Sequence, residues 1–315
     1  MTVESLTLQS SGDKMPMLGL GTWKIPNDST ADIVYKAIKS GYRLLDCASV
    51  YENEVQVGQG IKKAIEDGLI SRKELFITSK LWNTYHHKEH VPLALDRTLA
   101  DLGLDYVDLY LIHFPISLKF VPFEEQYPTE WGDVELDPVP MHETWAAMEG
   151  LVHSGKARNI GVSNFPIILM MDLLSYAKIK PAVLQVEIHP HFSNRAVIKY
   201  AQSQGLQVTS YSSFGPASYV EFSPEARNTT PLFKDERLAK IGAQHNKSVA
   251  QVILRWLVQN KIAVVPKSSD PARVEQNADI FNFELSTEEM KIVNGMNISF
   301  RWNEPAIFAG LPIYD

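Results

Sequence analysis

The chain has 315 residues, of which 45% are hydrophobic and 21% are charged, and its formal net charge is -7 at pH 7. This composition is typical of a globular protein with a large buried core. Positive and negative side chains are interspersed without a basic run, which argues against nucleic acid and anionic membranes as natural partners. A small molecule is therefore the expected partner.

The sequence also bears on the compartment. The first residues lack the basic segment and apolar core of a secretory signal, and no run of about 18 apolar residues occurs. Cys47 is the only cysteine, which excludes an internal disulfide and fits a reducing environment. We therefore expect a cytoplasmic protein without a membrane-spanning segment.

In chain order, apolar runs alternate with amphipathic segments. A two-stranded flap is predicted first, from 5–9 and 14–18, because a Ser-Gly-Asp turn separates the two runs. Eight barrel strands are then predicted at 17–23, 43–46, 75–80, 107–113, 157–163, 182–187, 206–211 and 262–266. Apolar residues at helical spacing predict helices at 29–39, 55–66, 91–102, 144–152, 168–176, 194–204 and 250–258.

This alternation predicts an α/β fold, a (β/α)8 TIM barrel that carries the flap at its N-terminus. No shift in composition marks a linker, so residues 1–315 are expected to form a single domain. Two long connections, 114–141 and 212–232, follow strands and are expected to be functional loops at the C-terminal face. The aromatic tail at 297–315 is expected to cross the barrel mouth.

Polar side chains stand at or just after the ends of three predicted strands. They are Asp46 and, five residues later, Tyr51, then Lys80 and His113. Each residue alone has an ordinary explanation, since turn residues, solvated lysines and hydrogen-bonded structural histidines are common. Because the carboxyl ends of barrel strands meet at one face, the four together predict a proton-transfer site.

Two other patterns compete with this interpretation and fail. Residues 19–24 lack the third glycine of a dinucleotide-binding fingerprint, so the spacing of Tyr35 and Lys39, which matches short-chain dehydrogenases, does not indicate a Rossmann fold. His86, His87 and His90 could be metal ligands, but the stretch 86–90 lacks the spacing of a zinc-binding helix motif, and His87, Glu89 and His90 are interpreted as part of a solvated loop. No metal is expected.

Three segments together resemble the signatures of the aldo-keto reductase family. They are 41–54 (Gly-Tyr-Arg-x-x-Asp-x-Ala-x-x-Tyr-x-Asn-Glu), 160–165 (Ile-Gly-Val-Ser-Asn-Phe) and 265–268 (Val-Pro-Lys-Ser), in the family's order along essentially the whole chain. Stretches 113–128, 210–216 and 301–305 are most similar to fungal aldose (xylose) reductases. The resemblance implies a barrel that binds NADPH or NADH across its C-terminal face and reduces an aldehyde to an alcohol.

The resemblance assigns a catalytic tetrad to the four strand-end residues. Tyr51 would donate a proton to the carbonyl oxygen, and Lys80 would lower the pKa of that phenol. Asp46 would pair with Lys80 and keep the ammonium in place, since an unpaired buried cation is costly. His113 would hydrogen-bond and orient the carbonyl.

The resemblance also implies cofactor-binding positions, grouped by the part of the nucleotide that they would meet. They are Ser163, Asn164, Gln185 and Tyr211 at the nicotinamide, Ser212, Phe214 and Ser218 at the pyrophosphate, and Glu221, Lys267, Ser268, Arg273 and Asn277 at the adenosine end. Cationic side chains would engage a 2′-phosphate, so NADPH is expected. The Glu221 carboxylate would let NADH bind as well.

The substrate pocket implied by the resemblance is largely apolar. Its positions are Trp23, Val50, Trp82, His113, Phe114, Trp302 and Asn303. The chain departs from xylose reductases at Val50, where they usually carry an aspartate thought to bind a sugar hydroxyl. We therefore expect a broad aldehyde reductase that handles glyceraldehyde and aromatic aldehydes better than pentoses, with Asn303 as the main neutral hydrogen-bonding group.

A second class of function also fits the resemblance, a catalytically silent NADPH-binding barrel with a structural or regulatory role. All four tetrad positions are present, which favours the active enzyme. Its expected partner is an aldehyde or aldose, and the expected assembly is a monomer or a weak homodimer.

Overall fold

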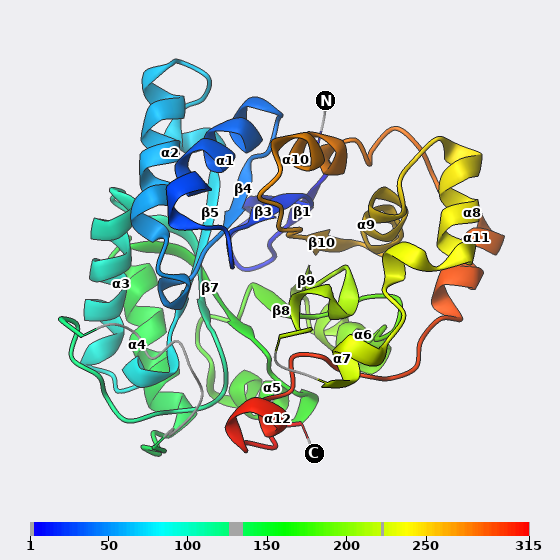
Figure 1. Ribbon diagram of the computed structural model, residues 1–315. Helices are drawn as coiled ribbons and strands as arrows, with labels where there is room; N and C mark the ends of the chain where they lie inside the picture. The colour runs from blue at the N-terminus through cyan, green and yellow to red at the C-terminus, as the bar shows by residue number, and fades with distance from the viewer. Residues whose placement is uncertain (1–2, 126–134, 222–223, 315) are drawn as a thin grey trace.

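The computed structural model describes residues 3–125, 135–221 and 224–314, and within them a parallel barrel forms the centre of the molecule (Figure 1). Its strands lie side by side in chain order from β3 to β10. They are β3 Gly19–Gly21, β4 Leu44–Asp46, β5 Phe76–Leu81, β6 Val107–Ile112, β7 Ala157–Ser163, β8 Val183–Glu187, β9 Gln207–Tyr211 and β10 Ile262–Val264.

The two ends of this sheet meet and close the barrel. Leu18, just before β3, pairs in parallel with Val264 of β10. The N–H of Val264 donates to the carbonyl of Met17 at 2.8 Å, and the N–H of Gly21 donates to the carbonyl of Pro266 at 3.1 Å. Closure leaves no sheet edge there to bind another strand. The (β/α)8 barrel predicted from the sequence is confirmed.

Helices surround the barrel, as Figure 1 shows. Those at the seven predicted places are α1 Asn27–Lys39, α2 Glu54–Glu66, α3 His90–Leu102, α4 Met141–His153, α5 Ile167–Tyr176, α6 Arg195–Ser203 and α9 Val249–Gln259. Their apolar faces pack on the strands, as amphipathic periodicity requires. Within the described residues, no helix is both long and apolar enough to cross a membrane.

Further helices were not predicted, and most of them are short. They are α7 Pro224–Asn228, α8 Glu236–His245, α10 Pro271–Ala278, α11 Thr287–Asn294 and α12 Pro305–Ala309. Side chains cap the starts of four of these helices: Asp235, Asp270, Ser286 and Glu304 each accept a hydrogen bond from a first-turn amide. Helix α10 has only eight residues, four of them polar, which is too short for a helical periodicity to stand out in the sequence.

The predicted flap is confirmed as an antiparallel hairpin, β1 Ser5–Thr7 and β2 Lys14–Pro16. Its turn contacts the barrel, because Asn159 in β7 donates to Asp13 at 2.8 Å. Buried Leu8 and Met15 then cover the N-terminal end of the barrel interior. The C-terminal end is thereby left as the place for a site.

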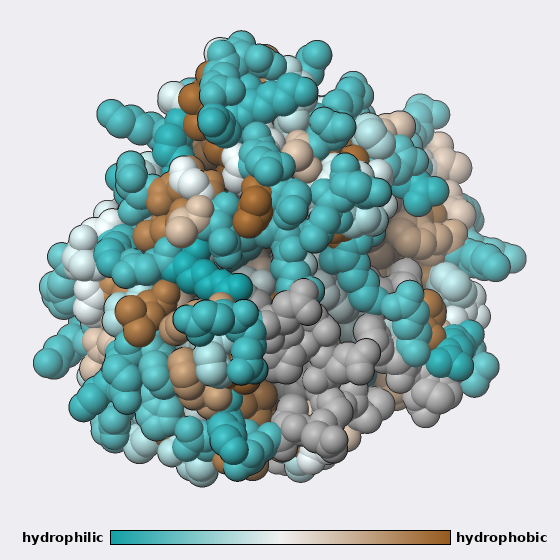
Figure 2. Space-filling model, turned by 60° about the vertical axis from the view of Figure 1, so that its left-hand side comes forward, coloured by the Kyte–Doolittle hydropathy of each residue, from teal (hydrophilic) through white to brown (hydrophobic). Residues whose placement is uncertain are grey.

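The core lies inside the barrel and under the helices, and polar residues cover the outside. Strands β5 and β6 are buried along their whole length, as strands of a barrel interior should be. The face in Figure 2 is mostly hydrophilic, with apolar side chains in small separate groups. The C-terminal tail follows the prediction for its course: the N–H groups of Trp302 and Asn303 bind Glu187 at the end of β8.

Gly161, in the middle of β7, provides a test of how tightly the strands are packed. A Cβ there would stand 2.5 Å from the carbonyl oxygen of Val183 and 2.8 Å from a methyl of Leu111. We expect Gly161→Ala to destabilise the fold by about 1–3 kcal/mol, the usual effect of overpacking, in a urea unfolding titration. Gly150→Ala, on the exposed side of α4 with nothing within 4 Å, is the control. It should be neutral or stabilising by about 0.5–1 kcal/mol.

Candidate active site

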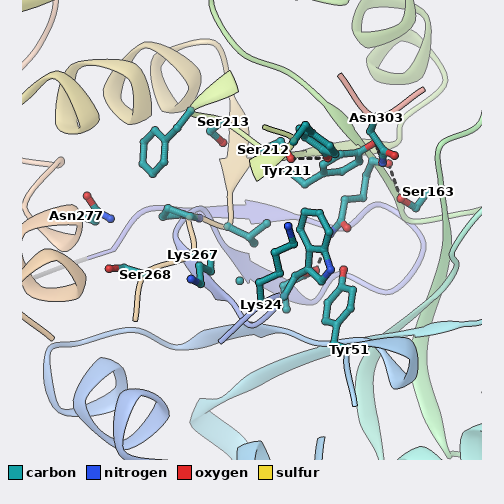
Figure 3. A pocket seen from close by; sticks show the side chains of 18 of the residues that line it. Lys24, Tyr51, Ser163, Tyr211, Ser212, Ser213, Lys267, Ser268, Asn277 and Asn303 are labelled. Carbon is teal, nitrogen blue, oxygen red and sulfur yellow. Dashed lines mark hydrogen bonds between the residues drawn. The ribbon is translucent and has the colours of Figure 1, made fainter. Parts of the chain in front are cut away.

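A cavity of about 1270 Å³ opens at the C-terminal end of the barrel. Every barrel strand contributes a lining residue at or near its carboxyl end. In strand order these are Gly21, Asp46, Trp82, His113, Ser163, Gln185, Tyr211 and Val265. Figure 3 shows side chains from both ends of this cavity, with Tyr51, Ser163 and Asn303 on one side and Ser268 and Asn277 on the other. The cavity is therefore elongated, with two chemically distinct ends.

At the inner end, the buried Lys80 ammonium joins three acceptors. It donates to Asp46 Oδ1 at 2.7 Å, to the carbonyl of Cys47 at 2.7 Å and to the hydroxyl of Tyr51 at 3.2 Å. An ammonium has three N–H groups, so all of them are used. Since the Tyr51 oxygen accepts from Lys80, its own proton remains free to point into the cavity.

His113 completes the predicted group of four. Its ring centroid lies 5.9 Å from that of Tyr51, edge to face, and Trp82 lies 5.2 Å away on another side. Tyr51 reaches this place because the short 3-10 helix Ser49–Tyr51 follows β4. The structure thus brings all four predicted tetrad residues together.

The pKa values show which protonation states the inner end favours. Burial raises the pKa of Tyr51 to about 12, although the charge of Lys80 acts in the opposite direction. Burial alone would lower the pKa of Lys80, but the neighbouring Asp46 and Tyr51 outweigh it and raise that pKa. Burial and the charge of Lys80 hold the pKa of His113 well below its usual value. At neutral pH the site therefore presents a phenol, an ammonium and a neutral imidazole.

This result corrects one expectation. The sequence predicted that Lys80 would lower the pKa of Tyr51, and its charge does act in that direction. The larger effect is burial of the phenol, which disfavours the charged form and leaves the pKa raised. Tyr51 is consequently a protonated donor throughout the neutral range.

Asn164 links the inner end to the neighbouring wall. Its Nδ2 donates to the carbonyl of His113 at 2.9 Å, while its Oδ1 accepts from the hydroxyls of Tyr211 at 2.5 Å and Tyr314 at 3.1 Å. The residue adopts a left-handed φ of 64°, a conformation that asparagine tolerates better than most side chains. The predicted nicotinamide residues Ser163, Asn164, Gln185 and Tyr211 all line this wall.

Gln185 has a second contact that the sequence did not predict. Its Nε2 donates to Asp46 Oδ2 at 2.6 Å, so the carboxylate is held by Lys80 on one oxygen and by Gln185 on the other. Gln185 therefore fixes Asp46 as well as lining the wall. The Gln185 side-chain oxygen takes no part in this bond.

The outer end of the cavity is cationic. Lys24, Lys267 and Arg273 line it, together with Ser268 and Asn277 of the β10–α10 region. Burial and the nearby charge of Lys24 lower the pKa of Lys267, which shows that two cations act on the same space. Converging cations and a helix N-terminus suit a phosphate-bearing ligand.

Two predicted residues do not line the cavity as expected. Trp302 packs beside it, in a buried cluster with Tyr219 and Ala226, so its ring is not part of the lining. The Glu221 carboxylate forms an ion pair with Lys24 at 2.9 Å and lies outside the lining set. The side chain of Ser218 lies outside the described residues. The remaining predicted cofactor and substrate positions, Ser212, Phe214, Trp23, Val50, Phe114 and Asn303 among them, do line the cavity.

Sequence reasoning missed several lining residues. No sequence motif marks these residues, which are Lys24, Tyr219, Phe233 and Ser248 at the start of α9. One signal was available for Ser248: it forms a capping box with Gln251, whose Ser-x-x-Gln spacing is visible in the sequence. Lys24 carried no comparable signal, because only folding places it opposite Glu221.

The loop predicted at His87, Glu89 and His90 is only partly solvated, since both histidines are half-buried and Glu89 is exposed. His86 is buried, His87 pairs with Asp137 at 2.9 Å, and His90 stacks on Phe120 at 3.9 Å. Burial lowers the pKa of His86 to about 3, so it stays neutral. In the residues that the structure describes, no group of three or more His, Cys, Asp or Glu is arranged to hold a metal ion.

Residues 17–298 match the model of the aldo/keto reductase family. The chain is 50% identical to an NAD(P)H-dependent D-xylose reductase of Scheffersomyces stipitis, over 97% of this chain and 98% of that protein. It is 48% identical to an NADPH-dependent D-xylose reductase of Meyerozyma guilliermondii, over 98% of this chain and 99% of that protein.

Solved structures agree with these sequence matches. The aldose reductase of Schistosoma japonicum superimposes with a TM-score of 0.88 at 40% identity, covering 99% of this chain and 98% of that one. A Bombyx mori aldo-keto reductase in complex with NADP gives a TM-score of 0.89 at 36% identity, covering 100% and 99%. Both comparisons extend over the barrel and the tail together.

Proposed function

This chain belongs to the aldo/keto reductase family, and we propose that it reduces aldehydes, aldoses among them, to alcohols with Tyr51 as the proton donor. It is an NAD(P)H-dependent oxidoreductase of that family. The observation that supports the role of Tyr51 is its contact with Lys80 at 3.2 Å, beside His113 and at the bottom of the cavity. Nothing in the geometry favours the silent barrel considered as an alternative.

The residues of the site can provide general acid catalysis for the reduction of a carbonyl group. NADPH, when bound, supplies a hydride to the carbonyl carbon. As negative charge grows on the carbonyl oxygen, the Tyr51 phenol can give up its proton, and the neutral His113 imidazole can donate a hydrogen bond to the same oxygen. The ammonium of Lys80 then stabilises the phenolate, while Asp46 keeps the ammonium in position.

The cavity fits the cofactor in both shape and chemistry. Asn164, Ser163 and Gln185 offer amide and hydroxyl groups where a nicotinamide carboxamide would bind, and the Tyr211 ring lines the same wall. The cations at the outer end suit the phosphates, and Lys267 is our choice for the 2′-phosphate. For Glu221, a role at the adenosine ribose would require its ion pair with Lys24 to rearrange.

The proposal extends to substrate and assembly. Relatives are named as D-xylose reductases, so an aldose is a natural substrate to test. The tetrad is complete within one chain, which supports a functional monomer or weak homodimer built from 1–315 as a single domain. The buried free thiol of Cys47 is compatible with a cytoplasmic location.

The role of Tyr51 can be tested with Tyr51→Phe. We expect kcat for glyceraldehyde to fall by about 10²- to 10⁴-fold, the usual contribution of general acid catalysis. NADPH affinity, followed by fluorescence quenching, should hardly change. Tyr35→Phe is the matched control, because that hydroxyl bonds Asp67 at 2.8 Å on the surface. A near-normal kcat of the Tyr51→Phe enzyme would contradict the role of Tyr51 as the proton donor.

Lys80 can be tested through the titration of the same phenol. The charge of Lys80 lowers the pKa of Tyr51, so Lys80→Met should move ionisation of Tyr51 to still higher pH and should also lose activity. Phenolate absorbance, measured as a difference from the corresponding Tyr51→Phe variants, follows that group alone. An unchanged titration would show that the two side chains are not electrostatically coupled.

Lys267 is predicted to select for the 2′-phosphate. Lys267→Met should raise KM for NADPH by about 10- to 100-fold, equivalent to losing one charge-assisted hydrogen bond of about 1.5–3 kcal/mol. KM for NADH should change much less. Lys261→Met, at the opposite end of β10 and exposed, serves as the control. Equal effects on both cofactors would place the 2′-phosphate elsewhere.

Val50 is predicted to limit the binding of sugars. It lines the cavity directly before Tyr51 and offers no hydrogen-bond acceptor. Val50→Asp should raise kcat/KM for xylose by about 2- to 10-fold, the value of one well-placed hydrogen bond, without improving benzaldehyde. Val55→Asp, at an exposed site in α2, controls for added charge. The pocket argument fails if wild type already prefers xylose and the variant gains nothing.

A further inference from the structure

Glu187, the last residue of β8, carries a carboxylate that the mechanism does not use. Its side chain is completely buried, and it is not part of the cavity lining found in the described chain. Across the residues that the structure describes, no lysine or arginine pairs with it; its one ionisable partner is His189, whose Nε2 lies 2.8 Å from Oε1. Because a buried carboxylate is costly unless hydrogen-bonded, its remaining partners matter.

Those partners are two consecutive backbone amides of the C-terminal tail. The N–H of Trp302 donates to Oε1 at 2.8 Å, and the N–H of Asn303 donates to Oε2 at 2.7 Å. Both carboxylate oxygens are therefore engaged by one short segment that lies 115 and 116 residues further along the chain. Such paired, charge-assisted contacts fix position and direction together.

The segment that Glu187 holds is the one that enters the cavity. Asn303 lines the cavity, and its Nδ2 donates to the hydroxyl of Tyr211 at 2.8 Å. Tyr211 in turn donates to Asn164 at 2.5 Å. The position of the Asn303 side-chain amide is therefore fixed by two contacts: Glu187 holds its backbone, and Tyr211 accepts a hydrogen bond from the amide itself.

Other contacts hold the tail on both sides of 302 and 303. Before them, the N–H of Ile298 donates to the carbonyl of His191 at 3.0 Å, and Asn297 Oδ1 accepts from the N–H of Ser193 at 2.9 Å. Arg301 stacks on the Tyr314 ring at 3.5 Å and approaches Glu304 at 3.7 Å, and the Tyr314 hydroxyl reaches Asn164 at 3.1 Å. These contacts hold the end of the tail over the barrel. None of these contacts involves the backbone amides of 302 and 303, which donate to Glu187.

We propose that Glu187 is a specificity-determining positioning residue, which holds the backbone at 302 and 303 so that the Asn303 amide forms the hydrogen-bonding wall of the substrate pocket. The inference rests on the proposed reductase function. Since the rest of the lining near Tyr51 is largely apolar, with Trp23, Trp82 and Phe114, a polyhydroxylated substrate depends on Asn303 more than an apolar aldehyde does. Loss of Glu187 should therefore act on selectivity.

Glu187→Gln tests this proposal with little change of side-chain volume. It removes one hydrogen bond, because the new amide nitrogen is a donor and cannot accept from a backbone N–H. Hydrogen exchange of the amides at 302 and 303, followed by mass spectrometry, should speed up by about tenfold or more, as expected for a lost charge-assisted bond. For xylose, kcat/KM should fall by about 5- to 20-fold, mainly through KM. For propanal it should change by less than about twofold, as should NADPH affinity.

Glu149→Gln is the matched control. Glu149 is also a buried carboxylate that accepts two consecutive backbone amides, from Lys178 at 2.7 Å and Ile179 at 2.9 Å, but it joins α4 to the segment after α5. Its loss should lower Tm without changing the ratio of xylose to propanal turnover. A merely structural role for Glu187 would give this same pattern.

The proposal is overturned if Glu187→Gln lowers both substrates equally, or if exchange at 302 and 303 is unchanged. In a double-mutant cycle with Asn303→Ala, the two effects on xylose should be clearly less than additive, and full additivity would also contradict it. If Glu187→Gln does not fold, His189→Phe removes one donor to the same carboxylate and should give the same pattern at smaller amplitude. If wild type reduces neither aldehyde, the proposed function fails, and the exchange measurement alone decides the anchoring.

Discussion

The arrangement of this molecule depends on one buried cation, the ammonium of Lys80 inside the barrel. A lysine with no exposure is tolerated only when all its protons find acceptors, and here Asp46, the carbonyl of Cys47 and the hydroxyl of Tyr51 provide them. These acceptors come from β4 and the turn after it, and the lysine comes from β5. The contacts that stabilise the buried charge are therefore the same contacts that fix the geometry of the acid site.

Burial keeps both neighbouring groups neutral, and the charge of Lys80 opposes this effect at Tyr51 but reinforces it at His113. Burial raises the pKa of Tyr51 to about 12, while burial together with the charge of Lys80 lowers that of His113. A protonated phenol and a neutral imidazole are both hydrogen-bond donors, and both face the cavity. Such opposed shifts on adjacent groups are characteristic of sites that transfer protons.

The barrel strands supply the framework of the cavity, and the connections and the tail supply the rest of its lining. Three residues that line the cavity, Lys24, Asn164 and Ser212, adopt left-handed φ angles of 59°, 64° and 49°, which are uncommon for residues other than glycine. Next to Tyr211 the tail brings Asn303 into the cavity, and Glu187 holds the backbone of Asn303. The four tetrad residues thus lie on or just after barrel strands, whereas the proposed substrate selectivity depends on the tail.

The sequence by itself determined the elements that repeat and the residues that stand in motifs. Eight strands, seven helices, the flap and the tetrad could be predicted because period, turn residues and motif spacing are local properties of the chain. Helix α10 was not predicted because its eight residues are too few to show a clear helical periodicity. Only the tertiary structure could decide the direction in which the pKa of Tyr51 shifts, because segments distant in sequence together bury this side chain. It also decided the pairing of Lys24 with Glu221, the exclusion of Trp302 from the cavity, and the contact of Glu187 with the tail. Each of these depends on atoms that come together only when the barrel closes.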